Sequence, residues 1–446
     1  MLEYWIQSGE ARLRDVEFNP EDAETIKDLI FPLFQSDGKM TLFTQKYFRH
    51  LNIKNKEDFM KKTITALASL KESKSKICFV CGKQGADKLK GWIFPFVITR
   101  EKFPNISNEI SICRECALKS FAAYTTAIFT TQGNYLNYII FFADNADELY
   151  LFMKEVKSAV QEFIPEYYRN WKLTALIYYP FEFLAYITND ITIYMETKKE
   201  IFDINIGAIV VSVDVGGSKK IYKTSSVITN VNLIAKLLIK FRKTVKTARR
   251  EKAERLLERG IEINPEIAKD PFRTMFSFMK KEMKVVANKV TPDLFVARNA
   301  FFKELYQYKN IDWKAVEEIV FYRAKENGTV PYLSQFLRTT MEVFNMSDKE
   351  LYDKVSGLGY TLGSALLQKG ERFERAKQYL FELRRKRNLE EFLDQINLIQ
   401  VYAETPVDDR PFRNNEKLFY KLKVFFLIGM ANAIFQNKPQ KAPEEE

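Results

Sequence analysis

Four cysteines in two Cys-x-x-Cys pairs are the feature that most constrains the fold of this chain. They are Cys78, Cys81, Cys113 and Cys116, and its 446 residues contain no others. A two-residue gap lets both thiolates of a pair turn onto one metal ion, and two such pairs complete a tetrahedral site. Gly82 follows Cys81 directly, where the absence of a side chain helps backbone amides face the sulfurs. The spacing predicts one structural Zn²⁺ bound by four cysteines, with no position left open for catalysis.

Two other interpretations of the cysteines stay open at this point. They could be unrelated buried pairs, or redox-active motifs, although two pairs without thioredoxin-like surroundings make redox chemistry the weaker alternative. Four cysteines in so long a chain argue against a disulfide framework.

The first fifteen residues lack the apolar core of a secretory signal. Pro180 and Glu182 interrupt the most apolar stretch, 173–187, so we expect a cytoplasmic protein with no membrane partner.

The chain contains a single histidine, His50. Histidine-dependent acid–base pairs and histidine-rich catalytic metal sites need a second imidazole or a neighbouring partner. The order of residues from Asp214 to Lys219 also lacks the glycine–lysine step of a Walker A loop. The sequence therefore favours a protein that is not an enzyme, with His50 as a structural or surface residue. A carboxylate-only two-metal nuclease stays an alternative, although no compact Asp/Glu cluster stands out.

Positive charge is concentrated in a predicted helix over 230–259. The whole chain carries 69 Lys and Arg against 58 Asp and Glu, a net charge of +11, which is typical of proteins with a polyanionic partner. Leu237, Phe241 and Val245 give this helix an apolar face, so its cations share the other side. A solvated helix face is the alternative interpretation. The cations predicted to contact phosphates are Lys236, Lys240, Arg242, Lys243, Lys246, Arg249 and Arg250.

Two smaller basic clusters are further candidates for nucleic-acid contact. A predicted helix over 371–387 ends in Arg384, Arg385 and Arg387, which could hold a passing single strand or complement the helix dipole. A predicted hairpin pairs 206–215 with 221–224. Its turn carries Lys219 and Lys220, which could reach a DNA groove or simply occupy a hairpin turn.

The expected fold class is α+β, with a mixed N-terminal body that holds the zinc site and a small sheet, followed by an all-α C-terminal helical bundle. A strand is also predicted over 188–197 from its Thr, Ile and Tyr content. Helices are expected near 147–163, 230–259, 265–290, 291–309, 312–326, 331–345, 347–368, 371–387, 388–403 and 413–435. The predicted domains are a mixed α/β region (1–75), a zinc-binding insertion (76–120), a mixed sheet region with the hairpin (121–228), a basic helical connector (229–290), the bundle (291–436) and a disordered tail (437–446).

Taken together, these parts resemble the large subunit of type I CRISPR Cascade surveillance complexes, of the I-A/I-B group. Besides the cysteine pairs, the resemblance is carried by Gly357-Leu-Gly-Tyr-Thr-Leu-Gly-Ser-Ala-Leu-Leu367 and Arg387-Asn-Leu-Glu-Glu-Phe-Leu-Asp-Gln-Ile-Asn-Leu398. It implies a non-catalytic role in antiviral defense. Such subunits recognise the protospacer-adjacent motif (PAM) in duplex DNA and help open it into an R-loop. The expected partners are the subunits and RNA of the crRNA-guided complex, double-stranded target DNA, the displaced single strand, and a helicase–nuclease recruited in trans.

Two functions from other classes compete with this expectation. One is a carboxylate-metal nuclease or nucleotidyl transferase that carries a zinc ribbon, which Mg²⁺-dependent cleavage by the purified protein would favour. The other is a scaffold whose basic helices bind a protein partner, which binding insensitive to salt would favour.

Overall fold

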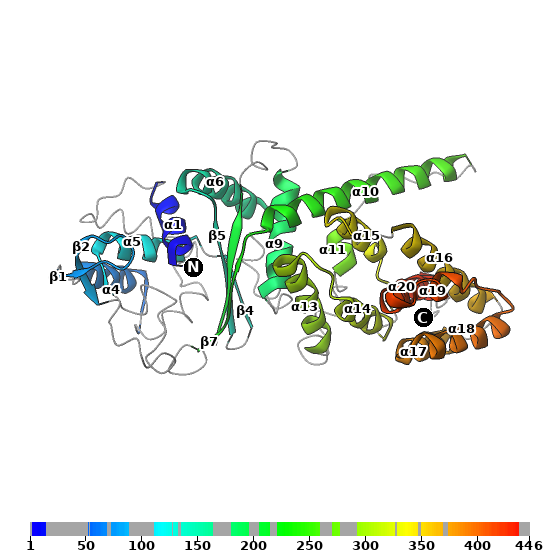
Figure 1. Cartoon of the computed structure of the whole chain (residues 1–446). Helices are drawn as coiled ribbons and strands as arrows, with labels where there is room; N and C mark the ends of the chain where they lie inside the picture. Colours follow the sequence, from blue (N-terminus) through cyan, green and yellow to red (C-terminus); the bar gives the residue numbers. More distant parts are fainter. Residues whose placement is uncertain are drawn as a thin grey trace, which may run out of the picture. The chain divides into compact units, whose positions relative to one another are not determined.

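The computed structural model confirms the expected fold class: it is mostly helical, with small antiparallel sheets and the four-cysteine cluster in its N-terminal part, and the residues that it describes from Val231 onward form helices and their connections, without a strand. It divides into two compact units, Met1–Leu233 and Ile234–Glu446 (Figure 1). The six predicted domains are finer than this division and stay predictions. The structure describes residues 2–14, 52, 54–68, 73–88, 111–126, 128–132, 135–163, 180–195, 205–214, 221–258, 270–276, 292–325, 328–346, 349–368 and 373–436.

The first unit contains two antiparallel sheets. One has three short strands in the order β1-β2-β3 and carries the cysteines at its strand ends. The other has four strands in the order β4-β5-β6-β7, and its central strands β5 and β6 bury a run of Ile, Val and Phe side chains. The strands are β1 (Ser73–Ile77), β2 (Gln84–Lys88), β3 (Ser111–Ile112), β4 (Ile128–Gln132), β5 (Tyr135–Phe142), β6 (Gly207–Asp214) and β7 (Ile221–Ile228).

The predicted pairing of β6 with β7 is confirmed. Val211 lies opposite Ser225, and an irregularity in register follows between Ser212 and Val213. The turn that carries Lys219 and Lys220 lies outside the described residues, so their predicted role stays a prediction. His50 and the predicted disordered tail lie outside them as well.

The predicted strand over 188–197 is wrong. Its described residues, 188–195, belong to helix α9 (Pro180–Met195), whose described side chains are almost all buried. The β-branched content that favours a strand is tolerated here, because the hydroxyl of Thr188 donates to the Leu184 carbonyl at 2.7 Å and that of Thr192 to Asn189 at 2.7 Å. Burial on all sides stabilises a helix against its intrinsic propensity. The other helices of this unit are α1 (Leu2–Leu13), α4 (Lys56–Ala68), α5 (Arg114–Tyr124) and α6 (Ala146–Phe163).

The second unit is a bundle of helices, and its elements match the predicted ones to within a few residues, apart from 265–290, of which only α11 is described. The predicted helix over 413–435 is divided: α20 is preceded by a short helix and a 3₁₀ turn. The elements are α10 (Val231–Leu257, which begins in the last residues of the first unit), α11 (Pro271–Phe276), α13 (Pro292–Tyr308), α14 (Trp313–Lys325), α15 (Leu333–Val343), α16 (Lys349–Gln368), α17 (Phe373–Arg385), α18 (Leu389–Ala403), α19 (Arg410–Arg413), η4 (Glu416–Leu418) and α20 (Phe419–Gln436).

Helix α20 forms the core of the bundle. Among the described residues, Glu416–Gln436 is the one helical segment long and apolar enough to span a membrane, but 78% of its apolar 18-residue stretch is buried inside the protein, as expected of a core helix. It crosses α16 at very short range. A Cβ atom added to Gly359 would lie 2.1 Å from the Phe426 carbonyl oxygen, and one added to Gly429 would lie 1.9 Å from the Ser356 carbonyl oxygen. Only glycine permits this approach of the two backbones.

A buried ion pair joins α20 to α14. The Lys423 ammonium lies 2.9 Å from the Glu317 carboxylate, and the two side chains are only 4% and 9% exposed. Lys423 also donates to the carbonyls of Arg384 and Lys386, at 2.5 and 2.9 Å, at the end of α17. Tyr420 donates to the other Glu317 oxygen, and burial together with this hydrogen bond raises the pKa of Tyr420 above its usual range. One lysine therefore fixes three helices.

We expect the substitution Lys423→Met to lower the free energy of unfolding by about 3 kcal/mol, because Glu317 would stay buried without its counter-charge. Chemical denaturation of the purified protein measures this. The double substitution Lys423→Met, Glu317→Leu removes the orphaned charge and should recover part of the loss. A single substitution that leaves the denaturation midpoint unchanged would show that the pair contributes no stability.

Candidate metal centre

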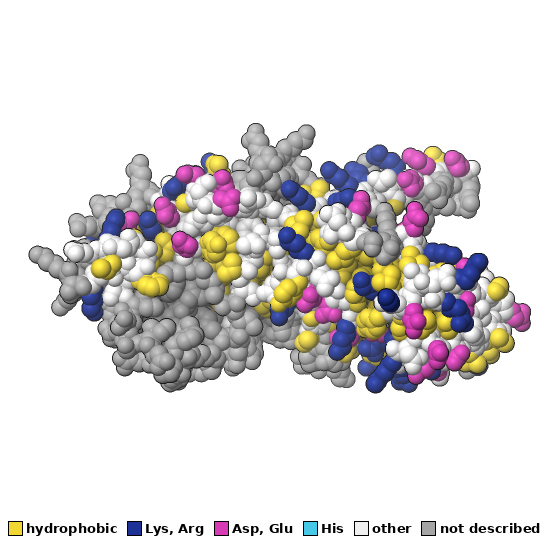
Figure 2. All heavy atoms as spheres, viewed as in Figure 1, with side chains coloured by type: hydrophobic (Ala, Val, Ile, Leu, Met, Phe, Trp, Pro, Cys, Tyr) yellow, Lys and Arg dark blue, Asp and Glu magenta, His cyan; other side chains and the backbone are white. Residues whose placement is uncertain are grey.

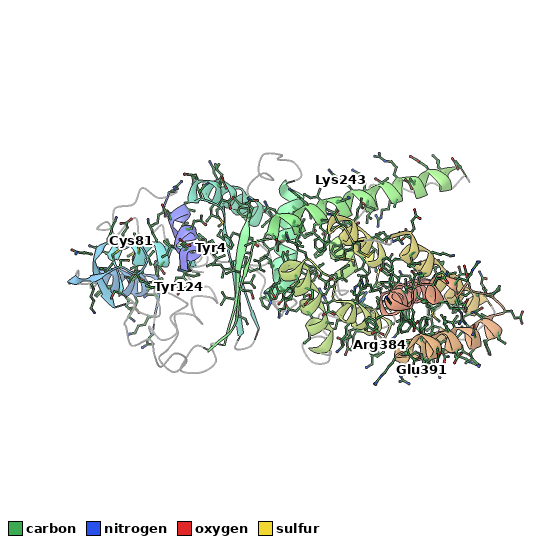
Figure 3. All side chains as sticks on the ribbon, viewed as in Figure 1. Tyr4, Cys81, Tyr124, Lys243, Arg384 and Glu391 are labelled. Carbon is green, nitrogen blue, oxygen red and sulfur yellow. The ribbon has the colours of Figure 1, made fainter. Side chains whose placement is uncertain are left out.

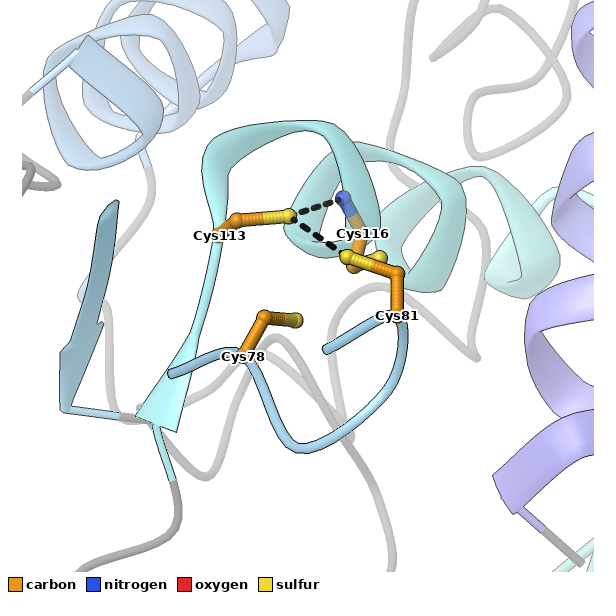
Figure 4. A group of neighbouring side chains, drawn as sticks. All are labelled: Cys78, Cys81, Cys113 and Cys116. Carbon is orange, nitrogen blue, oxygen red and sulfur yellow. Dashed lines mark hydrogen bonds between the residues drawn. The ribbon is translucent and has the colours of Figure 1, made fainter. Parts of the chain in front are cut away.

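The structure brings the sulfurs of Cys78, Cys81, Cys113 and Cys116 together in the first unit (Figure 4). All four lie within 4.8 Å of one another. Cys78 and Cys81 come from the turn between β1 and β2, while Cys113 follows β3 and Cys116 lies in the first turn of α5. The sulfurs of Cys81 and Cys113 lie 3.7 Å apart, far longer than the roughly 2.05 Å of a disulfide. Because the sulfurs of both pairs share one site, the alternative of two unrelated cysteine pairs is wrong.

Backbone geometry turns the first pair inward. Gly82 has a φ of +72°, a conformation that side chains disfavour, and its N–H donates to the Cys78 carbonyl at 2.9 Å. The Cys78 N–H donates to the Lys83 carbonyl at 2.8 Å, and the Phe79 N–H donates to Ser111 at 2.9 Å. These bonds close the turn and tie it to β3.

The second pair is held by a helix terminus. Cys113 is the N-cap of α5, and its sulfur accepts a hydrogen bond from the Cys116 N–H at 3.5 Å. A helix N-terminus directs unpaired N–H groups and a partial positive charge toward the cap, which favours a thiolate there. The Cys-x-x-Cys spacing thus matches one helical turn.

The thiols differ in how readily they ionise. Burial alone disfavours a thiolate at Cys78, but backbone N–H groups of Cys113, Cys81 and Val80 outweigh it and lower its pKa to about 7. Burial raises the pKa of Cys113, and burial and then the neighbouring Cys113 sulfur raise that of Cys116. Four ionised sulfurs at this distance would repel one another strongly, so a cation is needed to hold them all as thiolates. An all-sulfur tetrahedral set is typical of Zn²⁺ or iron–sulfur centres.

Helix α5, whose N-terminus holds Cys113 and Cys116, packs directly against the N-terminal helix α1. A Cβ on Gly9 of α1 would lie 1.6 Å from the Lys119 carbonyl oxygen of α5, so the two backbones are in direct contact. The Trp5 indole donates to both the carbonyl and the hydroxyl of Ser120 at 2.9 Å, and its ring packs edge-on against Tyr124. The packing of α1 therefore depends on the helix that the cysteines anchor. Neither helix is among those predicted from the sequence, although Gly9 near Trp5 is a signal for a close helix crossing.

The predicted basic residues of α10 lie mostly on its exposed face in the second unit. Lys236, Lys240, Lys243, Lys246 and Arg250 are exposed, and Figure 2 shows dark blue side chains along this helix. Lys243 points away from α10 in Figure 3. The opposite face, including Leu237, Phe241 and Val245, is buried.

Three of the predicted α10 cations interact with other residues, two of them with α15 or its N-cap. The Lys240 ammonium lies 2.7 Å from the Glu342 carboxylate. Arg249 donates to the Tyr332 hydroxyl and stacks over that ring at 5.3 Å. Arg242 is half-buried and also interacts with other side chains or backbone. Because these three side chains already interact with other residues of the protein, fewer cations of α10 remain for a phosphate backbone than the sequence predicts.

Of the three predicted arginines near the end of α17, one packs within the bundle and two are exposed. The Arg384 guanidinium lies 3.8 Å from the centre of the Phe321 ring, which gives it a packing role in the bundle. Arg385 and Arg387 are exposed. Arg385 also lines a shallow groove of about 390 Å³, in which acids partly balance the cations. Its lining residues are Lys325, Glu374, Lys377, Gln378, Phe381, Glu382 and Arg385.

Comparison with known proteins adds no relative to these observations. A scan against protein-family models finds no match, and a search of curated proteins finds none either.

Proposed function

We propose that this protein is a non-catalytic nucleic-acid-binding subunit whose N-terminal unit is stabilised by one Zn²⁺ at Cys78, Cys81, Cys113 and Cys116. The all-cysteine ligand set supports a structural ion, because four protein ligands leave no position for substrate or water. Zn²⁺ suits this set better than Mg²⁺ or Ca²⁺, which require oxygen ligands.

One observation carries the nucleic-acid part of the proposal. Lys236, Lys243, Lys246 and Arg250 are exposed on α10, and none makes an ion pair or hydrogen bond with another residue that the structure describes. Acidic partners in the loop before α19 compensate other exposed cations: Asp408 pairs with Lys354, and Asp409 pairs with Arg413. An uncompensated row of cations on a rigid helix attracts a polyanion, and phosphates at regular spacing release counterions on binding.

The resemblance to type I Cascade large subunits extends the proposal to a place in a crRNA-guided complex. In this role the protein recognises the PAM in duplex DNA, with Lys219 and Lys220 as candidates. It stabilises the opened R-loop for a separate helicase–nuclease, with Arg385 and Arg387 as candidate contacts to the displaced strand. The basic character and the single histidine support this role over an enzyme.

The substitutions Lys236→Gln, Lys243→Gln and Lys246→Gln, made together, test the α10 row. We expect duplex DNA to bind more weakly at all sequences, and the slope of log K against log salt to become shallower by about 2 to 3 units, since each lost phosphate contact removes about 0.9. Fluorescence anisotropy with a labelled duplex at several salt concentrations measures both.

A control variant with the same loss of charge is Lys354→Gln, Arg410→Gln and Arg413→Gln, because these cations are already paired with Asp408 and Asp409. It should bind DNA nearly as the unmodified protein does. Equal losses in the two variants would mean that net charge, and not the α10 row, governs binding. Cleavage of the duplex by the unmodified protein with Mg²⁺ would favour the nuclease alternative instead.

A further inference from the structure

Helix α18 has an exposed face whose chemistry differs from the rest of this basic chain. It contains three acidic residues, Glu390, Glu391 and Asp394, and no Lys or Arg. Its inner face packs in the core of the bundle, where Phe392 contacts three other phenylalanines at centroid distances of 5.4–5.6 Å. What remains outside is available to a partner.

The outer face is acidic in its first half and apolar in its second. Leu398, Val401 and Tyr402 are 59%, 80% and 41% exposed and lie at i, i+3 and i+4, so they form one continuous patch. Single exposed apolar residues are ordinary, but a contiguous group rimmed by charge marks an interaction site. Figure 2 shows hydrophobic side chains at the surface in the part of the bundle where Figure 1 labels α18.

The patch is held rigidly. Arg375 of α17 lies over the Tyr402 ring at 4.6 Å and near Tyr379 at 6.0 Å, which fixes the tyrosine against the neighbouring helix. At the other end, the Asn388 side chain caps α18 by accepting from the Glu391 N–H at 2.8 Å, and the Glu391 carboxylate accepts from the Asn388 amide at 2.9 Å. The surface is therefore preorganised for binding.

We propose that the outer face of α18 docks a cationic amphipathic helix of a partner protein. Glu390 and Asp394 have no partner among the residues that the structure describes, so the complementary surface carries Lys or Arg beside an apolar stripe. Nucleic acid and anionic membranes are disfavoured by the same carboxylates. The proposal is independent of the α10 row, because α18 contributes no cation to it.

The probe is a labelled 20-residue helical peptide with a leucine stripe and lysines on its remaining surface, titrated against the full-length protein by fluorescence anisotropy. We expect Leu398→Ser with Val401→Ser to weaken binding about tenfold or more. Glu390→Gln with Asp394→Gln should weaken it and reduce its salt dependence. The matched control is Val296→Ser with Tyr308→Ser, which removes similarly exposed apolar side chains, 50% and 63% exposed, from α13 of the same unit.

Three outcomes would overturn the proposal. One is equal binding by the α18 and α13 variants, which would mean non-specific attraction. Another is equal affinity for a peptide with every lysine replaced by glutamate. The third is binding to phosphatidylcholine–phosphatidylserine vesicles that Leu398→Ser with Val401→Ser abolishes while the peptide still binds, which would assign the patch to a membrane surface. DNA binding by the α10 row should be unchanged in every α18 variant, so failure here is distinguishable from failure of the nucleic-acid proposal.

Discussion

The substitution Gly359→Val is expected to lower the free energy of unfolding by about 4 kcal/mol, a large share of the roughly 5–15 kcal/mol that stabilises an ordinary domain. The first added carbon alone would lie 2.1 Å from the Phe426 carbonyl oxygen, and the obstacle is backbone that no side-chain rotation can clear. Helices α16 and α20 would have to separate along their whole contact, which forms the centre of the bundle. Denaturant unfolding followed by circular dichroism measures the loss, and low soluble yield is its first sign.

Gly357 gives the matched control for this prediction on the same helix. A Cβ at Gly357 would meet nothing within 4 Å, and the residue is exposed. Gly357→Ala should therefore raise stability by about 0.5–1 kcal/mol, because alanine loses less backbone entropy in a helix. Similar stability of Gly359→Val and Gly357→Ala would contradict the close crossing. A destabilised Gly359→Val would show that the glycine motif behind the Cascade resemblance serves packing.

Loss of the proposed metal centre is the second change with a large expected effect. Cys113→Ser should reduce the thermal stability of the N-terminal unit by several degrees or more, because binding of a structural ion contributes directly to folding. Since α1 packs on α5 through Gly9 and Trp5, the indole should become exposed as the centre fails. A red shift of tryptophan fluorescence and faster proteolysis near residue 1 report this.

Glu115→Gln separates loss of the centre from a general surface change. Glu115 pairs with Lys83 and Lys119 next to the cysteines, and these two cations lower its pKa, but it is no ligand of the predicted ion. It should change stability by less than about 0.5 kcal/mol. If Cys113→Ser unfolds no more readily than Glu115→Gln, the cysteines do not stabilise the unit.

Features set by short-range sequence pattern could be predicted. The bundle helices follow from apolar residues at helical spacing, and the cysteine cluster from two-residue gaps that each match a turn. Features set by contacts between distant segments could not. Residues 188–195 of the predicted strand are helical, because Thr188 and Thr192 donate their hydroxyls to carbonyls within the helix and the surrounding protein buries it. Arg384 looks like a phosphate contact in sequence, but Phe321 from α14 packs under its guanidinium.

Contacts between distant segments also explain why α10 has fewer unpaired exposed cations than the sequence predicts. Helical spacing places all seven on the polar side, yet it cannot show that Glu342 and Tyr332 lie opposite two of them. Gly359 belongs to a glycine motif that the sequence shows, but the need for glycine there comes from the Phe426 carbonyl, which is distant in sequence. In each case the missing information is the identity of the packing partner.

Metal analysis of the freshly purified full-length protein tests the central claim of a four-cysteine zinc centre most directly. Inductively coupled plasma mass spectrometry should find about one zinc per chain. A thiol reagent should detect the four cysteines only slowly until a strong chelator is added, and fully afterwards. Protein that contains no zinc or other metal and whose four thiols react at once without chelator would contradict the account.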